Sequence, residues 1–545
     1  MVTAEIDLTT PRGELLSRTD GAHFDVLIIG GGIHGAACAR SAATQGLRTL
    51  LLEKADYGAA TSTRSSKMAH GGLRYLEMFD FEQVFEGIKA REDLFASAPH
   101  IVSPTRFLIP IPKGQLFFKL KLGLGLYLYD LMVREKGRKH CFLTSDQLQE
   151  TGFYERRHDL IGCYSYTDGL LNDGLLTLEN VLAARQHGAI CLNYAGVTSL
   201  DERPTGVEVA WTDELSGTTH RATAAAVLNC AGPWAPFLVP AGTRPEVRLS
   251  RGTHLIFNRP WKGPSLFLPM EGKARYYFVW PHAAGTMVGT TERETDSLDL
   301  DPFPSVDEID EILARLKKDL PESGLDRTSL HYCFAGVRTL PLRPNSKAGT
   351  TRLSRKHIWH GGGRVLSLVG GKLTTATWTA EEGVQKVLGH IAPGKTFRSV
   401  RRETMPRANV PAATIEKFSL DARRSGLSEE QIQRLIHRYG GDVGRFDVEQ
   451  LASLGADTRV GEVALALNLE QAETVEDVMR RRLNLEYLTG HGLEALPQIV
   501  KLMTRLRPGR SFDGEAARYQ ERLTQLRALM GLSPLSEAPR MAATS

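Results

Sequence analysis

Three glycines and one acidic residue near the start of the chain have the spacing of a dinucleotide-binding site. Gly30, Gly32 and Gly35 form the pattern G-x-G-x-x-G, and Glu53 follows them. The first glycine permits a tight turn, the second lets the backbone approach a pyrophosphate, and the third lets a helix pack closely against a strand. A carboxylate at the position of Glu53 can accept hydrogen bonds from both hydroxyls of an adenosine ribose. These residue types therefore indicate dinucleotide binding.

The next segment, residues 59–76, combines hydroxyl side chains with a histidine-glycine-glycine turn. It contains a lysine preceded by a cluster of hydroxyl residues: Thr61, Ser62, Thr63, Ser65, Ser66 and Lys67. Clustered hydroxyls and a lysine suit a loop that hydrogen-bonds phosphates. His70, Gly71 and Gly72 follow, and a backbone without side chains can come very close to a flat ring. A solvated loop rich in serine and threonine is the alternative.

These residues need elements that position them. Residues 26–29 are a short run of branched apolar residues, which is typical of a buried strand. An alanine-rich helix is predicted over 34–45, and a second strand over 48–52 places Glu53 at its C-terminal end. The helix N-terminus would offer free N–H groups and a partial positive charge to phosphates. The alternative, a glycine-rich turn without a ligand, leaves Glu53 unexplained.

Composition excludes several classes of function. The chain has 545 residues, a formal net charge of +4 and 42% hydrophobic residues, as is ordinary for a soluble globular protein. This charge is too small to indicate nucleic-acid binding. The six cysteines are scattered without a C-x-x-C pair, which favours reduced thiols in the cytoplasm and no metal site. No run of about 18 apolar residues could span a bilayer, and the polar residues 1–22 are expected to be a flexible N-terminus.

Beyond the glycine pattern, the segment SSKMAHGGLRYLE closely resembles the FAD-dependent glycerol-3-phosphate dehydrogenases. These are aerobic, quinone-linked enzymes in the wider group of flavoproteins that resemble D-amino-acid oxidase. The resemblance extends over about residues 24–380, through LNCAGPW from Leu228, GTHLIF from Gly252, FAGVRTLPL from Phe334 and GGKLTT from Gly370. Several motifs in one order are far more specific than the glycine pattern alone.

The resemblance implies a fold of three parts. A discontinuous, Rossmann-like α/β domain that binds FAD is expected over 23–100, 165–247 and 335–400. A mixed or antiparallel β domain that caps the substrate is expected over 101–164 and 248–334. An all-α C-terminal domain is expected over 401–532, where strand patterning is lost, and residues 533–545 are expected to be disordered.

The resemblance also implies a reaction. The substrate would be sn-glycerol 3-phosphate, oxidised to dihydroxyacetone phosphate by hydride transfer to FAD, with the electrons passed to a membrane quinone. His70 and His254 are the candidates for the base, because the pKa of histidine suits proton transfer near neutral pH. Arg338 is the main candidate for holding the substrate, because its guanidinium can bridge phosphate or hydroxyl oxygens. The alternatives are that His70 only positions the flavin, that His254 is a core histidine, and that Arg338 pairs with an internal carboxylate.

The remaining site residues follow from the motif and the resemblance together. The residues assigned to substrate binding are Arg74, Tyr75, Arg251, Arg338, Lys372 and Thr374. The residues assigned to FAD binding are Gly30, Gly31, Gly32, Ile33, His34, Gly35, Glu53, Lys54, Thr61, Ser62, Ser65, Ser66, Lys67, His70, Gly71, Gly72, Val197, Ala231, Gly232, Gly336, Gly371, Lys372, Leu373 and Thr374.

Departures from the family pattern keep further functions open. Ala376 and Thr377 replace an aromatic residue and an arginine that usually follow GGKLTT, and Arg251 stands where a lysine is common. The substrate could therefore be another polyol phosphate, such as erythritol phosphate. An oxidase that passes electrons to oxygen is compatible with the same motifs, and so is a flavin-binding regulator without redox activity.

Residues 117–133 are apolar and are followed at once by a basic cluster. Leucines at every second position from Leu120 to Leu128 favour a strand, but the resemblance implies a helix, and we follow the resemblance. A leucine-rich surface beside basic residues suits a membrane interface, and a core element followed by a charged turn is equally compatible. We therefore expect a cytoplasmic protein with the option of peripheral attachment to the inner face of the membrane. A homodimer is also open.

Overall fold

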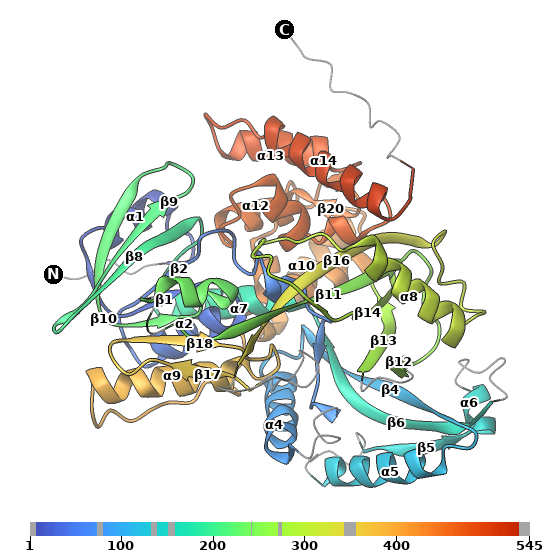
Figure 1. Cartoon of the computed structure of the whole chain (residues 1–545). Coiled ribbons are helices and arrows are strands. Elements are labelled where there is room, and N and C mark those ends of the chain that lie inside the picture. The colour runs from blue at the N-terminus through green and yellow to red at the C-terminus, as the bar shows by residue number, and fades with distance from the viewer. Residues whose placement is uncertain are drawn as a thin grey trace.

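Two β-sheets and a helical C-terminal unit make up the computed structural model, which describes residues 7–73, 80–131, 139–150, 159–240, 242, 244–270, 275–342 and 356–533. In Figure 1 the first sheet lies at the left, the second at the right, and the C-terminal helices lie above them. This arrangement confirms the predicted fold class, an α/β domain with a β cap and a helical C-terminal domain.

The first sheet carries the predicted strand–helix–strand unit. Its main path runs in the order β17-β18-β10-β1-β2-β7, with β1 parallel to β2 and β10. These strands are β1 (His23–Ile29), β2 (Thr49–Leu52), β7 (Ile190–Leu192), β10 (Thr219–Asn229), β17 (Ile358–His360) and β18 (Val365–Val369). The helices α2 (Ile33–Thr44), α7 (Asp173–Gln186) and α9 (Ala376–Ile391) pack together on one face.

Both faces of β1 are buried, which explains its continuous apolar sequence. Val26 and Ile28 join the cluster under α2, whereas Leu27 and Ile29 join a cluster on the other face. That second cluster also includes residues of β8 (Ala195–Arg203), β9 (Gly206–Asp213) and a short helix, α1 (Arg12–Thr19).

Helix α1 corrects the expectation that residues 1–22 are flexible. Leu15 is fully buried against the first sheet, and the Arg12 guanidinium lies 2.7 Å from the Asp213 carboxylate. One buried leucine and one ion pair attach the helix to the first sheet. Neither contact could be predicted from the polar composition of the segment.

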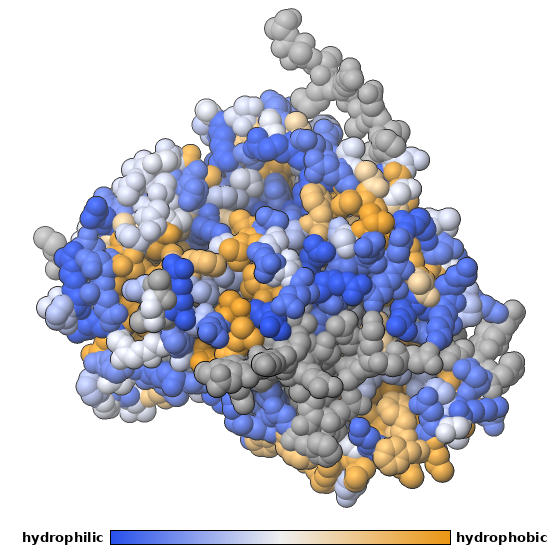
Figure 2. Space-filling view, in the orientation of Figure 1, coloured by the Kyte–Doolittle hydropathy of each residue, from blue (hydrophilic) through white to orange (hydrophobic). Residues whose placement is uncertain are grey.

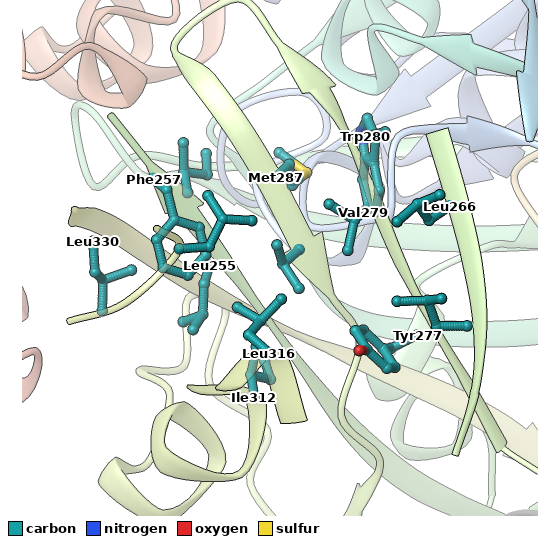
Figure 3. Packing of buried hydrophobic residues seen from close by; sticks show 14 of the residues in the cluster. Leu255, Phe257, Leu266, Tyr277, Val279, Trp280, Met287, Ile312, Leu316 and Leu330 are labelled. Atoms are coloured by element: carbon teal, nitrogen blue, oxygen red, sulfur yellow. The ribbon is translucent and has the colours of Figure 1, made fainter. Parts of the chain in front are cut away.

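The second sheet forms the cap. Its pairings are antiparallel except that β12 runs parallel to β4. The strands are β3 (Met68–Ala69), β4 (Val102–Pro112), β5 (Cys141–Thr144), β6 (Leu160–Leu171), β11 (Val247–Phe257), β12 (Ser265–Met270), β13 (Arg275–His282), β14 (Gly285–Gly289), β15 (Arg293–Glu294) and β16 (Leu330–Pro341). Figure 3 shows its core, where Leu255, Val279 and Trp280 pack beside Ile312 and Leu316 of α8 (Val306–Asp319).

Two of the predicted domain boundaries fall in the middle of strands. The boundary between residues 164 and 165 divides β6, and the boundary between 334 and 335 divides β16. Each strand runs without a break from the cap core into the region between the sheets. Two of the connections between the cap and the FAD-binding part are therefore continuous strands.

Residues 116–130 form a helix, α5 (Leu116–Asp130), so the strand indicated by the leucine alternation is wrong and the helix implied by the resemblance is confirmed. Leucines at every second position spread around a helix, so some of them face solvent. The outer face of α5 exposes Leu116, Phe117, Leu120, Leu124 and Leu131, with Phe117 81% exposed. Figure 2 shows hydrophobic residues at the lower edge of the molecule, where Figure 1 places α5. Of the basic cluster, residues 134–138 lie outside the described residues.

Among the helices that the structure describes, none is both long enough and apolar enough to cross a membrane.

Two further helices flank the cap, α4 (Phe81–Ser97) and α6 (Ser145–Glu150).

The C-terminal helices share a core with the rest of the chain and do not form a separate body. They include α10 (Ala412–Arg424), α11 (Glu429–Tyr439), α12 (Val460–Asn468), α13 (Leu496–Leu506) and α14 (Asp513–Leu529), with a small ribbon of β19 (Ser453–Gly455) and β20 (Thr458–Arg459). Phe418 and Leu435 pack in one cluster with Leu175 of α7. Asp56, just after β2, accepts hydrogen bonds of 2.7 Å from Arg481 and from Arg482, and these partners hold the pKa of Asp56 near 2 against the opposing effect of burial.

The contact between the cap and the C-terminal helices should weaken in acid. Burial lowers the pKa of His331 to about 4, and His331 Nε2 lies 2.7 Å from the Tyr487 carbonyl oxygen. In the unfolded chain the same ring takes up a proton near pH 6.5. The contribution of the neutral ring to the free energy of unfolding is therefore fully present above pH 6.5. It decreases as the pH falls toward 4, by up to about 1.4 kcal/mol per pH unit. His331→Gln keeps a donor for Tyr487 and should flatten the pH dependence of the unfolding temperature over this range. Parallel curves for the two proteins would contradict this assignment.

Candidate functional site

A cavity of about 600 Å³ lies between the two sheets, at the C-terminal ends of β1 and β2. Its wall includes residues of the glycine loop, the hydroxyl segment, β16 and the loop after β18. A crevice at the carboxyl ends of parallel strands is the usual position of a dinucleotide in such folds. The segments that the sequence analysis singled out therefore line one cavity.

Part of the cavity wall has the geometry of a pyrophosphate cradle. Gly30 has a φ of +97°, in the left-handed region that favours glycine. A Cβ on Gly35 would lie 1.8 Å from the Gly30 carbonyl oxygen, so helix α2 packs directly on the turn. The first helical amide, Ile33 N–H, donates to Ser62 Oγ at 2.9 Å. The hydroxyl segment thus lies over the helix N-terminus, where phosphates bind favourably.

Glu53 lies where its sequence position predicted, at the end of β2 and in the cavity wall. Its oxygens accept hydrogen bonds from Gly31 N–H at 2.5 Å and Ala55 N–H at 2.9 Å. Burial raises the pKa of the Glu53 carboxyl, and these two amides oppose that shift. Farther along the wall, the Lys54 ammonium lies 3.6 Å from the centre of the Trp234 ring. Val197, which the resemblance assigns to FAD binding, also lines the cavity.

The wall of the cavity contains a half-buried imidazole that fits a flavin. His34 Nε2 is buried and has no hydrogen-bond partner among the described residues. A Cβ on Gly371 would lie 2.5 Å from that nitrogen, and Gly371 has a φ of +101°. Burial lowers the pKa of His34 to about 3, so the ring is neutral and can offer either a donor or an acceptor. This orphaned polar atom and the cradle of glycines both fit FAD.

The candidates for substrate chemistry line the same cavity. His70, Arg338, Lys372 and Thr374 all line it. The Arg338 guanidinium donates to Thr290 Oγ1 at 2.9 Å, and the His70 amide donates to Thr374 Oγ1 at 3.2 Å. Three distant segments of the chain thus bring a cation, an imidazole and hydroxyls together. Such a set can hold an anionic substrate and take a proton from its hydroxyl.

Arg251 does not belong to this set, and strand register is the reason. In the pairing of β11 with β16, Ser250 lies opposite Arg338 and Arg251 lies opposite Val337. Paired residues share a face and neighbours alternate, so Arg251 and Arg338 point to opposite faces of the sheet. The Arg251 guanidinium lies 2.8 Å from the Glu308 carboxylate, outside the cavity wall.

His254 lies behind the wall. It is 1% exposed, and its Nε2 lies 2.9 Å from Ser66 Oγ, a residue that itself lines the cavity. Its ring stacks on Phe334 at 5.0 Å. Burial, together with Arg338 and Lys67, lowers the pKa of His254 well below its usual value. The prediction that this histidine contacts substrate is therefore not supported by its position.

Lys67 is also turned away from the cavity, because its ammonium lies 2.6 Å from the Asp173 carboxylate. Gly31, Gly35 and Gly71 lie next to the wall without lining it, and their contribution is to the backbone behind it. The other predicted FAD-contact residues all line the cavity. Arg74 and Tyr75 lie outside the described residues.

Sequence reasoning missed an acidic residue and an aromatic wall. Asp168 and Tyr166 are two residues apart on β6, and both line the cavity. Phe267, Tyr276 and Phe278 of the cap also line it, with the rings of Phe267 and Tyr276 stacked at 4.3 Å. The period-two spacing was visible in the sequence, but it does not reveal which face of a strand meets a cavity.

Replacing Gly35 by alanine tests the cradle. The added methyl would overlap the Gly30 carbonyl oxygen, so the turn must shift. We expect FAD binding to weaken by about 3 kcal/mol, or roughly 100-fold, measured by titrating apoprotein with FAD. Gly389→Ala in α9 is the control, because nothing lies within 4 Å of its new methyl. Equal FAD affinity in the two variants would exclude the cradle.

Comparisons with known proteins agree with this geometry. A family model described as FAD dependent oxidoreductase matches residues 25–384, and one described as the C-terminal domain of alpha-glycerophosphate oxidase matches residues 366–507. A glycerol-3-phosphate dehydrogenase of Synechocystis is 32% identical, covering 88% of this chain and 92% of that protein. A D-erythritol 1-phosphate dehydrogenase of Brucella abortus is 31% identical, covering 84% and 93%.

Solved structures show the same fold. The glycerol-3-phosphate dehydrogenase of Bacillus halodurans complexed with FAD superposes with a TM-score of 0.75 at 24% identity, over 98% of this chain and all of that chain. An L-alpha-glycerophosphate oxidase of Mycoplasma pneumoniae with FAD bound has a TM-score of 0.55 at 18% identity, over 67% of this chain and 94% of that chain.

Proposed function

We propose that this chain, which belongs to the family of FAD-dependent oxidoreductases in the group that includes glycerol-3-phosphate dehydrogenases, oxidises sn-glycerol 3-phosphate to dihydroxyacetone phosphate. The observation that carries the proposal is one cavity lined both by the dinucleotide cradle and by Arg338, Lys372 and His70. A phosphate needs the cations, and a secondary hydroxyl needs a base.

The proposed roles follow from this arrangement. When bound, FAD supplies the group that accepts a hydride from the substrate carbon and gives the two electrons to a second acceptor. His70 would take the hydroxyl proton, so that the carbon loses a hydride, the oxygen loses a proton and a carbonyl forms. Arg338, fixed by Thr290, would hold the phosphate together with Lys372.

A four-carbon polyol phosphate is a second candidate substrate. The relative named D-erythritol 1-phosphate dehydrogenase is nearly as similar to this chain as the relative named glycerol-3-phosphate dehydrogenase. Ala376 begins α9 just beyond the cavity-lining Thr374, where the usual family pattern has a larger residue. Ala376 is buried and does not line the cavity, so this second candidate rests on the similarity to that relative.

We infer that the second electron acceptor is an apolar molecule such as a quinone, rather than oxygen. Tyr166 and Phe267 of its aromatic wall belong to one hydrophobic cluster with Leu126 and Tyr129 of α5. Apolar residues thus continue from the cavity wall to the helix whose outer face is exposed. A small polar substrate has no use for such a wall, whereas a quinone ring stacks on aromatic side chains.

The proposed function is tested by one spectrum. Purified protein loaded with FAD is mixed anaerobically with glycerol 3-phosphate, and loss of flavin absorbance is expected within seconds. Erythritol 1-phosphate is the matched comparison. The compound that reduces the flavin faster is assigned as the substrate. A soluble quinone should then restore the absorbance faster than air does, whereas stoichiometric peroxide in air would favour an oxidase. No bleaching with any polyol phosphate would refute the proposal.

The outer face of α5 is proposed to dock on an anionic membrane. This face, made of Leu116, Phe117, Leu120, Leu124 and Leu131, is exposed, and the exposed Lys113, Lys121 and Lys139 flank it. An apolar helix face beside lysines binds the interface of anionic lipids without crossing the bilayer.

Leu120→Glu tests this docking. Burying one leucine in the interface contributes about 1.5–3 kcal/mol, so we expect binding to vesicles of phosphatidylglycerol and phosphatidylcholine to weaken at least roughly tenfold in co-sedimentation. Leu420→Glu is the matched control, because Leu420 is also an exposed leucine on a helix, α10, far from α5 in the fold. Equal losses in both variants would contradict a specific docking face.

A further inference from the structure

The His70–Gly71–Gly72 turn is held from behind by one buried carboxylate. Asp168 Oδ1 accepts hydrogen bonds from Gly71 N–H at 3.0 Å, from Arg91 Nη1 at 2.8 Å and from the Tyr129 hydroxyl at 2.8 Å. These partners come from the turn, from α4 and from α5, and Asp168 itself lies on β6. One oxygen atom therefore ties four separate segments together.

The hydrogen-bond network around Asp168 is rigid, because its side chains are buried and hydrogen-bonded to one another. Arg91 is fully buried and also donates to the Tyr129 hydroxyl at 2.7 Å and to the Thr167 carbonyl at 2.6 Å. Tyr129 is 2% exposed, and burial raises the pKa of its hydroxyl well above the usual value, so it remains a donor. Hydrogen bonds to a charged group in a buried network are among the strong ones.

The turn also has no room to move toward this network. A Cβ on Gly71 would lie 2.1 Å from the Tyr129 hydroxyl oxygen, and a Cβ on Gly87 of α4 would lie 2.8 Å from the Gly71 carbonyl oxygen. The backbone of the turn therefore packs directly on α4 and α5. On its other side the His70 amide donates to Thr374 Oγ1 in the loop after β18.

We propose that Asp168 is a positioning residue for His70, and that Tyr129 and Arg91 hold its carboxylate in place. The inference rests on the proposed function, in which His70 takes the substrate proton. A base must lie within hydrogen-bond reach of the hydroxyl, and a misplacement of about 1 Å can slow a reaction roughly 100-fold. Asp168 is the group that fixes the backbone next to this base.

Two variants and one control test the proposal in the FAD-loaded enzyme. Tyr129→Phe removes a single hydroxyl from an apolar cluster and should slow flavin reduction by glycerol 3-phosphate about fivefold, the usual effect of one hydrogen bond. Asp168→Asn removes the charge and should slow it roughly 30-fold or more. Tyr127→Phe removes a hydroxyl from the exposed side of the same helix and should leave the rate unchanged. Rates are measured per bound flavin in single turnovers, and the apparent dissociation constant of glycerol 3-phosphate from the same experiment should change less than about twofold.

A second readout does not depend on turnover. Hydrogen exchange of the Gly71 amide should be faster in Tyr129→Phe and in Asp168→Asn than in wild type and Tyr127→Phe, and the visible circular dichroism of bound FAD should change with it. Wild-type rates and wild-type Gly71 exchange in both variants would overturn the proposal, as would a lower unfolding temperature with an unchanged rate per flavin. If Asp168→Asn fails to fold, Tyr129→Phe decides. Failure of wild type to reduce its flavin would instead refute the proposed function.

Discussion

Replacing His70 by glutamine should slow flavin reduction by glycerol 3-phosphate at least ~100-fold, because a positioned base commonly contributes 100- to 10,000-fold. Glutamine keeps a side chain of similar size and can still hydrogen-bond, but it cannot take up a proton near neutral pH. His70 lines the cavity and its amide is fixed by Thr374, so the backbone of the turn should persist in the variant. Stopped-flow absorbance of bound flavin under anaerobic conditions measures the effect.

His254→Gln is the matched comparison. His254 lies behind Ser66 and is kept neutral by burial, so its replacement should act only through the packing of that serine. We expect a loss of less than about tenfold in the rate of flavin reduction, together with a lower unfolding temperature. If His254→Gln loses more than His70→Gln, the base is relayed through Ser66 and our assignment of His70 is wrong.

Replacing Arg338 by alanine should lower kcat/KM by at least about 30-fold, which corresponds to more than ~2 kcal/mol of lost transition-state stabilisation. The guanidinium lines the cavity and is fixed to Thr290, so it can meet a phosphate without reordering. Arg338→Lys keeps the charge but not the planar fork, and should recover only part of the loss. Steady-state rates with a soluble quinone measure both variants.

Arg248→Ala is the control for a lost positive charge. Arg248 lies on β11 with its guanidinium 2.9 Å from the Glu294 carboxylate, and it does not line the cavity. Its kcat/KM should match wild type. An Arg338→Ala variant with unchanged kcat/KM would mean that Arg338 holds neither phosphate nor hydroxyl.

The local parts of this protein were predictable because their cause is local. The glycine loop, the apolar strands beside it and the alanine-rich helix each follow from steric and packing needs within a few residues. β1, α2 and β2 accordingly match the predicted ranges to within a few residues. Helix α5 shows the limit, because its leucines satisfied a strand period and only the family pattern indicated a helix.

The sequence by itself determined which residue types are available: a glycine cradle, an acid at the end of β2, and several histidines and arginines inside recognisable motifs. The tertiary structure alone decided which of them meet in the cavity. Arg251 and Arg338 differ by one step of register on paired strands and so face opposite sides, while His254 shares the face of Phe334 and is covered by Ser66. Asp168 reaches the cavity because β6 crosses from the cap to the turn that it holds. Strand register and the covering of one segment by another arise from contacts between residues distant in the chain, and no local pattern specifies them.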